Sequence, residues 1–162
     1  MYNLDVVQIR LVKEAAWYSD TPINSGKDAV DFLAKKFDDL DREIFCILNL
    51  TTEGKVINFN VVSMGTLNAS LVSPREVFKS SILSNAASII ALHNHPSGSL
   101  KASKQDKLIT QRLREAGDLL DIQLLDHIIV GGKEGRYYSF HEDNLLNTDF
   151  RKQFIDERYN YR

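Results

Sequence analysis

Two histidines, His93 and His95, stand one residue apart at the end of the apolar run Ser88–Leu92. Such a run is typical of a buried strand, and side chains two apart on a strand leave by the same face, so both imidazoles can point toward one spot. The connection that follows contains proline and glycine and predicts a turn. Asp106 then opens a helical pattern. Two imidazoles and one carboxylate can occupy three corners of a zinc tetrahedron and leave the fourth to water, as in catalytic zinc sites.

Each part of this pattern also has a purely structural reading. Two nearby histidines are more often surface residues than ligands, and Ser103 followed three residues later by Asp106 is a helix-capping pattern. The functional reading gains weight because the features are joined: the histidines end a strand, the turn is short, and the carboxylate lies in the first turn of the next helix. The carboxyl ends of strands are where α/β proteins commonly place their chemistry.

The motif H-N-H-P at 93–96, followed after six residues by S-x-x-D at 103–106, resembles the signature of the JAMM/MPN (JAB) metalloprotease family. The segments M-G-T-L-N-A-S-L-V-S-P-R-E-V-F at 64–78 and L-D-H-I-I-V-G-G at 125–132 are similar to the RadC branch of that family. The resemblance spans residues 25–138, which is most of the chain, and the joined motif is specific.

The resemblance implies that His93, His95 and Asp106 bind a catalytic Zn²⁺ ion. It also implies that Ser103 helps to hold an oxyanion and that Glu43 is the general base. Spacing alone could not have selected Glu43 among 22 acidic residues. The implied activity is zinc-dependent hydrolysis of an amide bond, peptide or isopeptide, in a peptide or protein substrate. A link to DNA repair comes with the RadC name.

The hydrophobic pattern predicts an α/β fold with a mixed β-sheet flanked by helices, in the order β-α-β-β-α-β-α-β-β. The resemblance implies the JAMM/MPN fold, which is related to the cytidine deaminases. Deaminase chemistry itself needs a second cysteine, which the chain lacks. Strands are predicted at 6–12, 44–50, 55–62, 88–92, 122–130 and 136–140, and helices at 26–38, 74–85 and 104–116 with Gly117 as C-cap.

The length of 162 residues fits a single domain. We expect residues 1–24 to add an N-terminal strand and loop, residues 25–143 to form the RadC-like metal domain, and residues 144–162 to form a helical tail. In that tail, Leu146, Phe150 and Phe154 recur at helical spacing. This stripe predicts packing on the chain's own domain or on a sister chain, so a homo-oligomer is one expected arrangement.

Composition restricts the partners and the location. The net charge is −2 and the isoelectric point is about 6.1, whereas phosphate-binding domains usually show a basic face. We therefore expect no direct nucleic-acid binding, and the chain leaves no room for the helical region that precedes many RadC-like metal domains. No apolar run approaches the roughly 18 residues of a membrane span, and no signal peptide is recognisable. The single cysteine, Cys46, is expected to be a buried thiol in a cytoplasmic protein.

Other polar residues near the motif have weaker signals. His127, in an apolar strand, is more often a packed core residue, and contact with a metal ligand is the alternative. Asn94 should point to the strand face opposite the ligands and serve packing, whereas Ser97 and Asn68 could line the cleft. His141, beside acidic residues, is expected on the surface.

Two further functions compete with the hydrolase. One is a non-catalytic interaction module of the MPN type, and the other is a DNA-repair accessory protein. Modules of the first kind usually lack the ligand set, which this chain retains, so the sequence favours the enzyme.

Overall fold

The computed structural model describes residues 7–8, 10–14, 16–38, 40–65 and 72–159 and forms one mixed α/β domain, as the sequence predicted. Residues 66–71, which include Asn68, lie outside the described residues. The elements are α1 (Gly26–Phe37), β1 (Glu43–Leu50), β2 (Val56–Gly65), α2 (Pro74–Leu83), β3 (Ser88–Asn94), α3 (Lys104–Leu120), β4 (Gln123–Val130), β5 (Tyr137–Ser139) and α4 (Phe150–Tyr159).

The five strands form one sheet in the order β2-β1-β3-β4-β5. β1 pairs antiparallel with both β2 and β3, and β4 pairs antiparallel with β5. Only β3 and β4 run parallel, and α3 makes the crossover between them. This topology places the ends of three elements at the same side of the sheet: the start of β1, the end of β3 and the beginning of α3.

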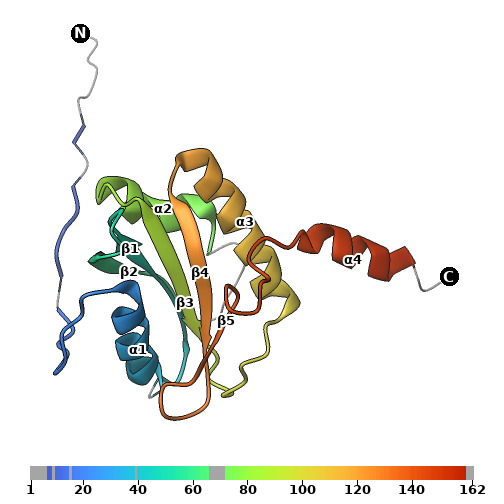
Figure 1. Ribbon diagram of the computed structural model, residues 1–162, viewed down its shortest axis with the longest axis horizontal. Helices are drawn as coiled ribbons and strands as arrows, with labels where there is room; N and C mark the ends of the chain where they lie inside the picture. The colour runs from blue at the N-terminus through green and yellow to red at the C-terminus, as the bar shows by residue number, and fades with distance from the viewer. Residues whose placement is uncertain (1–6, 9, 15, 39, 66–71, 160–162) are drawn as a thin grey trace, which may run out of the picture.

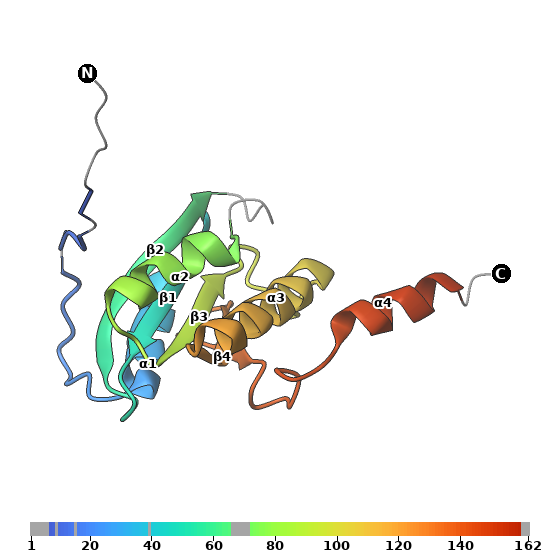
Figure 2. The same ribbon diagram turned by 90° about the horizontal axis from the view of Figure 1, so that it is seen from above.

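Helices cover both faces of the sheet (Figures 1 and 2), because the central strands are apolar on both sides. α1 packs on one face against alternate residues of β1 and β3, among them Leu48 and Leu92. α2 and α3 pack on the other face, where Ile47 and Ala91 point. Cys46, on the α1 face, is fully buried, and burial raises the pKa of its thiol.

The predicted strand at 6–12 is wrong for the residues that can be described there. Residues 7–8 and 10–12 form no strand, and Val7 and Val12 are 79% and 82% exposed. An alternating pattern makes a strand only where a neighbouring strand and a core face are available to it. Further along the chain, the ring of Trp17 contacts those of Phe37 and Phe59 at centroid distances of 6.3 and 5.1 Å.

α3 does not end at Gly117, which was predicted to be its C-cap. The helix continues to Leu120 and is capped by Asp121 in the left-handed conformation, with φ of 55°. Gly117 is needed for a different reason, since a Cβ atom there would lie 2.4 Å from the carbonyl oxygen of Ile122. The glycine thus allows close approach between the helix and the chain that enters β4.

The C-terminal helix α4 extends away from the sheet (Figures 1 and 2). It contains Phe150 and Phe154 of the aromatic stripe identified in the sequence. Phe150 is 1% exposed and Phe154 is 9% exposed, and both pack with Ile129 and Phe140. The stripe is therefore buried against the chain's own domain. Among the described residues, no helix has the length and apolar character that crossing a bilayer requires.

The N-terminus of α1 offers a test of these assignments. Ser25 accepts a hydrogen bond from the backbone N–H of Asp28, and the Asp28 carboxylate accepts one from the backbone of Ser25 in return. Removing such a cap typically costs about 1 kcal/mol. We expect Ser25→Ala to lower the free energy of unfolding by that amount, measured by urea denaturation.

Ser73 provides the matched control, because it is the N-cap of α2 but its side chain makes no capping hydrogen bond. Ser73→Ala should therefore leave the free energy of unfolding nearly unchanged. Equal losses in the two variants would contradict the capping role of Ser25.

Candidate metal centre

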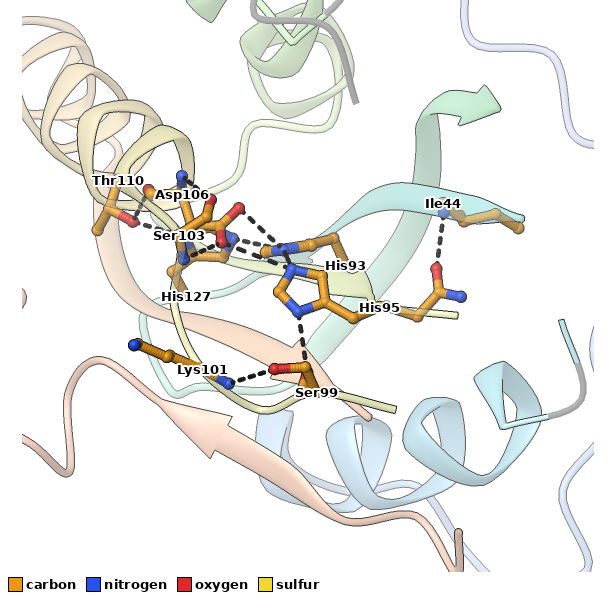
Figure 3. A network of polar contacts seen from close by, with 10 residues as sticks. Ile44, His93, His95, Ser99, Lys101, Ser103, Asp106, Thr110 and His127 are labelled. Carbon is orange, nitrogen blue, oxygen red and sulfur yellow. Dashed lines mark hydrogen bonds and ion pairs between the residues drawn. The ribbon is translucent and has the colours of Figure 1, made fainter. Parts of the chain in front are cut away.

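The histidine pair ends β3, and the strand runs to Asn94, two residues beyond its predicted end. β3 lies between β1 and β4, so His93 is 0% exposed and its ring stacks on that of Phe45 at 5.9 Å and 15°. His95 follows directly after the strand, and its backbone N–H donates to the carbonyl of Val130 on β4. The Nε2 atoms of the two histidines lie 3.0 Å apart (Figure 3).

Asp106 approaches the same point from the first turn of α3. Its carboxylate accepts the backbone N–H of Ser103 at 2.6 Å, while the Ser103 hydroxyl accepts the N–H of Asp106 at 3.1 Å. This capping box fixes the carboxylate, which lies 3.2 Å from His93 Nε2 and 3.5 Å from His95 Nε2. Asp106 can therefore cap α3 and face the two histidines in the same conformation.

The three side chains fit a four-coordinate metal ion. Bonds of 2.0–2.1 Å at tetrahedral angles place neighbouring ligand atoms about 3.3 Å apart. The two Nε2 atoms lie 3.0 Å apart, Oδ1 of Asp106 lies 3.2 Å from that of His93, and Oδ2 lies 3.5 Å from that of His95. One ligand atom from each of the three residues lies within 4.8 Å of the other two. Nitrogen and carboxylate oxygen are also the donor types that such ions prefer. His93, His95 and Asp106 could therefore hold a metal ion.

Charge within the group favours ionised Asp106 beside the imidazoles. Burial alone would raise the pKa of this carboxyl, but hydrogen bonds from His93 and His95 outweigh burial and hold it well below its usual range. Its place in the first turn of a helix acts in the same direction. The hydrogen bond to Asp106 also raises the pKa of His95. An anion at this position would attract a cation.

The second ring nitrogen of His95 has a backbone partner. Nδ1 lies 2.8 Å from the carbonyl oxygen of Ser99, in the turn that follows the strand (Figure 3). Because a carbonyl can only accept, Nδ1 carries a proton, and in the neutral imidazole Nε2 then has the lone pair that a metal ion would need. Ser97, expected to line the cleft, is exposed, and its hydroxyl accepts the N–H of Ser99 in the same turn.

Glu43 is the first residue of β1, at the same edge of the sheet. β1 and β3 are in register at Phe45 and His93, so two further residues bring Glu43 opposite His95. After the hydrogen bond to Asp106, which has the largest effect, the negative charge of Glu43 also raises the pKa of His95.

Asn94 holds the backbone on both sides of Glu43. Its side-chain oxygen accepts the N–H of Ile44 at 2.7 Å, and its side-chain nitrogen donates to the carbonyl of Arg42 at 3.0 Å. The side chain is buried on the face opposite the two histidines, as expected, but it does more than fill space. It continues the pairing of β1 with β3 beyond the last paired residues.

The sequence left two roles open for His127, and the structure agrees with both, since the residue is buried and also contacts a candidate metal ligand. It is 0% exposed, and its Nε2 lies 2.9 Å from Nδ1 of His93. Burial lowers the pKa of His127 well below its usual value, so its ring is neutral. An apolar strand predicted a packed histidine, and only the parallel pairing of β3 with β4 shows which group it contacts. His141, by contrast, is exposed, as expected.

Comparison with known proteins agrees with this architecture. A model of the RadC-like JAB domain matches residues 23–145. A UPF0758 protein of Moorella thermoacetica is 46% identical over 128 residues, which are 79% of this chain and 55% of the relative. A UPF0758 protein of Methanosarcina mazei is 44% identical over 124 residues, 76% of this chain and 53% of the relative.

A third UPF0758 protein, of Methanococcoides burtonii, is 39% identical over 140 residues, 85% of this chain and 60% of the relative. The chain thus spans little more than half the length of the curated relatives it matches. The matched region contains β1, β3 and α3, and with them all three candidate metal ligands. The chain belongs to the RadC-like JAB domain family.

Proposed function

We propose that this protein is a zinc-dependent hydrolase of amide bonds, either peptide or isopeptide, in peptide or protein substrates. The observation that carries the proposal is the convergence of His93, His95 and Asp106, whose ligand atoms lie within 4.8 Å of one another. Three protein ligands leave one corner for solvent, which is the arrangement of catalytic zinc sites.

In this proposal His93, His95 and Asp106 hold the ion, and two further residues act on the substrate. Bound zinc would supply positive charge that acidifies a water molecule and polarises the substrate carbonyl. Glu43 takes the proton from the attacking water and delivers it to the leaving amine. Ser103 donates a hydrogen bond from its hydroxyl to the carbonyl oxygen as negative charge develops there.

The capping role of Ser103 is compatible with that second task. In the capping box the hydroxyl oxygen of Ser103 uses one of its lone pairs to accept a hydrogen bond from the N–H of Asp106. Its own proton is not used by the cap, so the same hydroxyl can accept on one side and donate on the other.

Two observations favour an enzyme over the alternatives of an interaction module or a DNA-repair accessory protein. The complete ligand set is retained and lies at one point, whereas a scaffold would not need it. The net charge of −2 also gives no support to binding through phosphates. The names of the relatives mention no activity, so the reaction is inferred from the site.

Zinc binding should depend on the histidine pair. We expect the wild type to bind about one zinc ion per chain and His95→Ala to bind it on the order of 100-fold more weakly, because one of three protein ligands is lost. Competition with a chromophoric chelator measures both affinities.

His141→Ala is the matched control, since it removes an exposed imidazole outside the group. It should bind zinc as the wild type does. Equal affinity in His95→Ala and His141→Ala would exclude the ligand assignment.

Glu43→Gln should separate catalysis from metal binding. Removal of a general base typically costs 10²- to 10⁴-fold in rate, so this variant should keep its zinc and lose turnover by about that factor. Turnover can be measured on a panel of peptides and ubiquitin-like fusions, with metal content determined on the same samples.

Glu53→Gln makes the same chemical change in the hairpin between β1 and β2, where the side chain is 70% exposed. It should leave both turnover and zinc content unchanged. Loss of zinc in Glu43→Gln would instead make Glu43 a ligand or a structural residue.

A further inference from the structure

A chain of buried hydrogen bonds connects two of the candidate ligands through residues that contact no metal. His93 Nδ1 lies 2.9 Å from His127 Nε2, and His127 Nδ1 lies 2.6 Å from Thr110 Oγ1. Thr110 Oγ1 then donates to the backbone carbonyl of Asp106 at 2.7 Å. The chain leaves the ligand on β3, passes through β4, and returns to the ligand on α3 (Figure 3).

Metal ligation through His93 Nε2 allows only one arrangement of protons along this chain. A neutral imidazole has one N–H, so occupied Nε2 places the proton on Nδ1, which donates to His127 Nε2. His127 then carries its own proton on Nδ1 and donates a hydrogen bond to Thr110 Oγ1. The hydroxyl of Thr110 donates a hydrogen bond to the backbone carbonyl of Asp106, so every donor in the chain meets an acceptor.

Without a metal, the same atoms can form hydrogen bonds that run in the opposite direction. Thr110 can donate to His127, His127 to His93, and His93 Nε2 to the Asp106 carboxylate 3.2 Å away. The direction of the chain is therefore linked to the state of His93 Nε2. Any substitution that disfavours the proton arrangement required by metal ligation should weaken metal binding.

Aromatic rings on both sides restrict the imidazole of His127. The ring of Phe140 is stacked on it at 5.1 Å and 9°, and that of Phe45 lies at 5.6 Å and 60°. Phe45 also stacks on His93. Rotation of either imidazole is opposed by this packing, so the chain is maintained by shape as well as by hydrogen bonds.

We propose that His127 and Thr110 are positioning residues for the metal centre. They hold His93 with Nε2 free of a proton and directed at the ion, and they tie the ligand on β3 to the ligand on α3. This inference rests on the proposed metal binding by His93, His95 and Asp106. It assigns to the metal centre a histidine and a threonine that would otherwise count as core packing.

Thr110→Val tests the inference because valine has the shape of threonine and lacks the hydroxyl. In the metal-bound sense it leaves the N–H of His127 buried without an acceptor. We expect the zinc affinity of Thr110→Val to fall by about 10- to 100-fold, as measured by chelator competition. Thr110→Ser, the matched control, keeps the hydroxyl and should bind zinc nearly as the wild type does.

A second measurement reads the proton positions directly and does not require a variant to fold. In the zinc-loaded wild type labelled with ¹⁵N-histidine, two-bond NMR correlations should show His93 and His127 both protonated at Nδ1. A merely structural role of His127 would not determine its tautomer. Thr110→Val should shift the ring signals of His127, and Thr110→Ser should restore them.

The outcomes distinguish this inference from the function on which it rests. Zinc binding by the wild type with undiminished affinity in a folded Thr110→Val, or with His127 protonated at Nε2, would overturn the positioning role and leave the proposed function intact. A wild type that binds no zinc would overturn the proposed function, and the positioning role with it.

Discussion

A negative charge at a nearly closed position is the constraint on which the site depends. Asp106 is 3% exposed, and an ionised carboxylate in such a place must be compensated by hydrogen bonds and opposite charge. The cap of α3 and the two imidazoles at the end of β3 provide that compensation. Without the two imidazoles at the end of β3, the packing of α3 on the sheet would bury the charge of Asp106 at a cost in free energy. A cation at the same point would complete the balance.

The strands of the sheet position the groups that surround Asp106. β3 is central, so the backbone before the histidines is paired on both sides, to β1 and to β4. Parallel β4 places His127 behind His93, and antiparallel β1 places Glu43 beside His95. The candidate site thus combines contributions from four elements that are separated in sequence and adjacent in space. Rigid strands and a helix terminus carry all of them, apart from His95 at the first residue of the turn.

The sequence predicted the elements that carry the site better than those around it. Long apolar runs and a capping pattern located β1, β3 and α3 to within a few residues, because strand burial and helix capping are local properties. The segment at 6–12 has the same local pattern but no partner strand, and Gly117 looks like a helix end although its role is close packing. Both errors concern tertiary contacts that no local pattern reports.

The same distinction holds within the candidate site. His93, His95 and Asp106 could be grouped from spacing because they lie within 14 positions of one another on adjoining elements. Glu43 required the family pattern, because it comes from a strand 50 residues earlier. The contact of His127 with His93 and the grip of Asn94 on the backbone beside Glu43 depend on strand pairing, which the sequence does not specify.

Asn94 shows how little tolerance this arrangement has. Its neighbours on either side are the two imidazoles, and because successive side chains on a strand alternate between faces, one short segment serves both sides of the sheet at once. A shift of β3 by one residue would turn the Asn94 side chain toward the candidate metal position and both imidazoles toward the face that α1 covers. An insertion or deletion of one residue within β3 would therefore turn the two histidines away from Asp106, whereas a change of length in an outer loop would leave the three residues together.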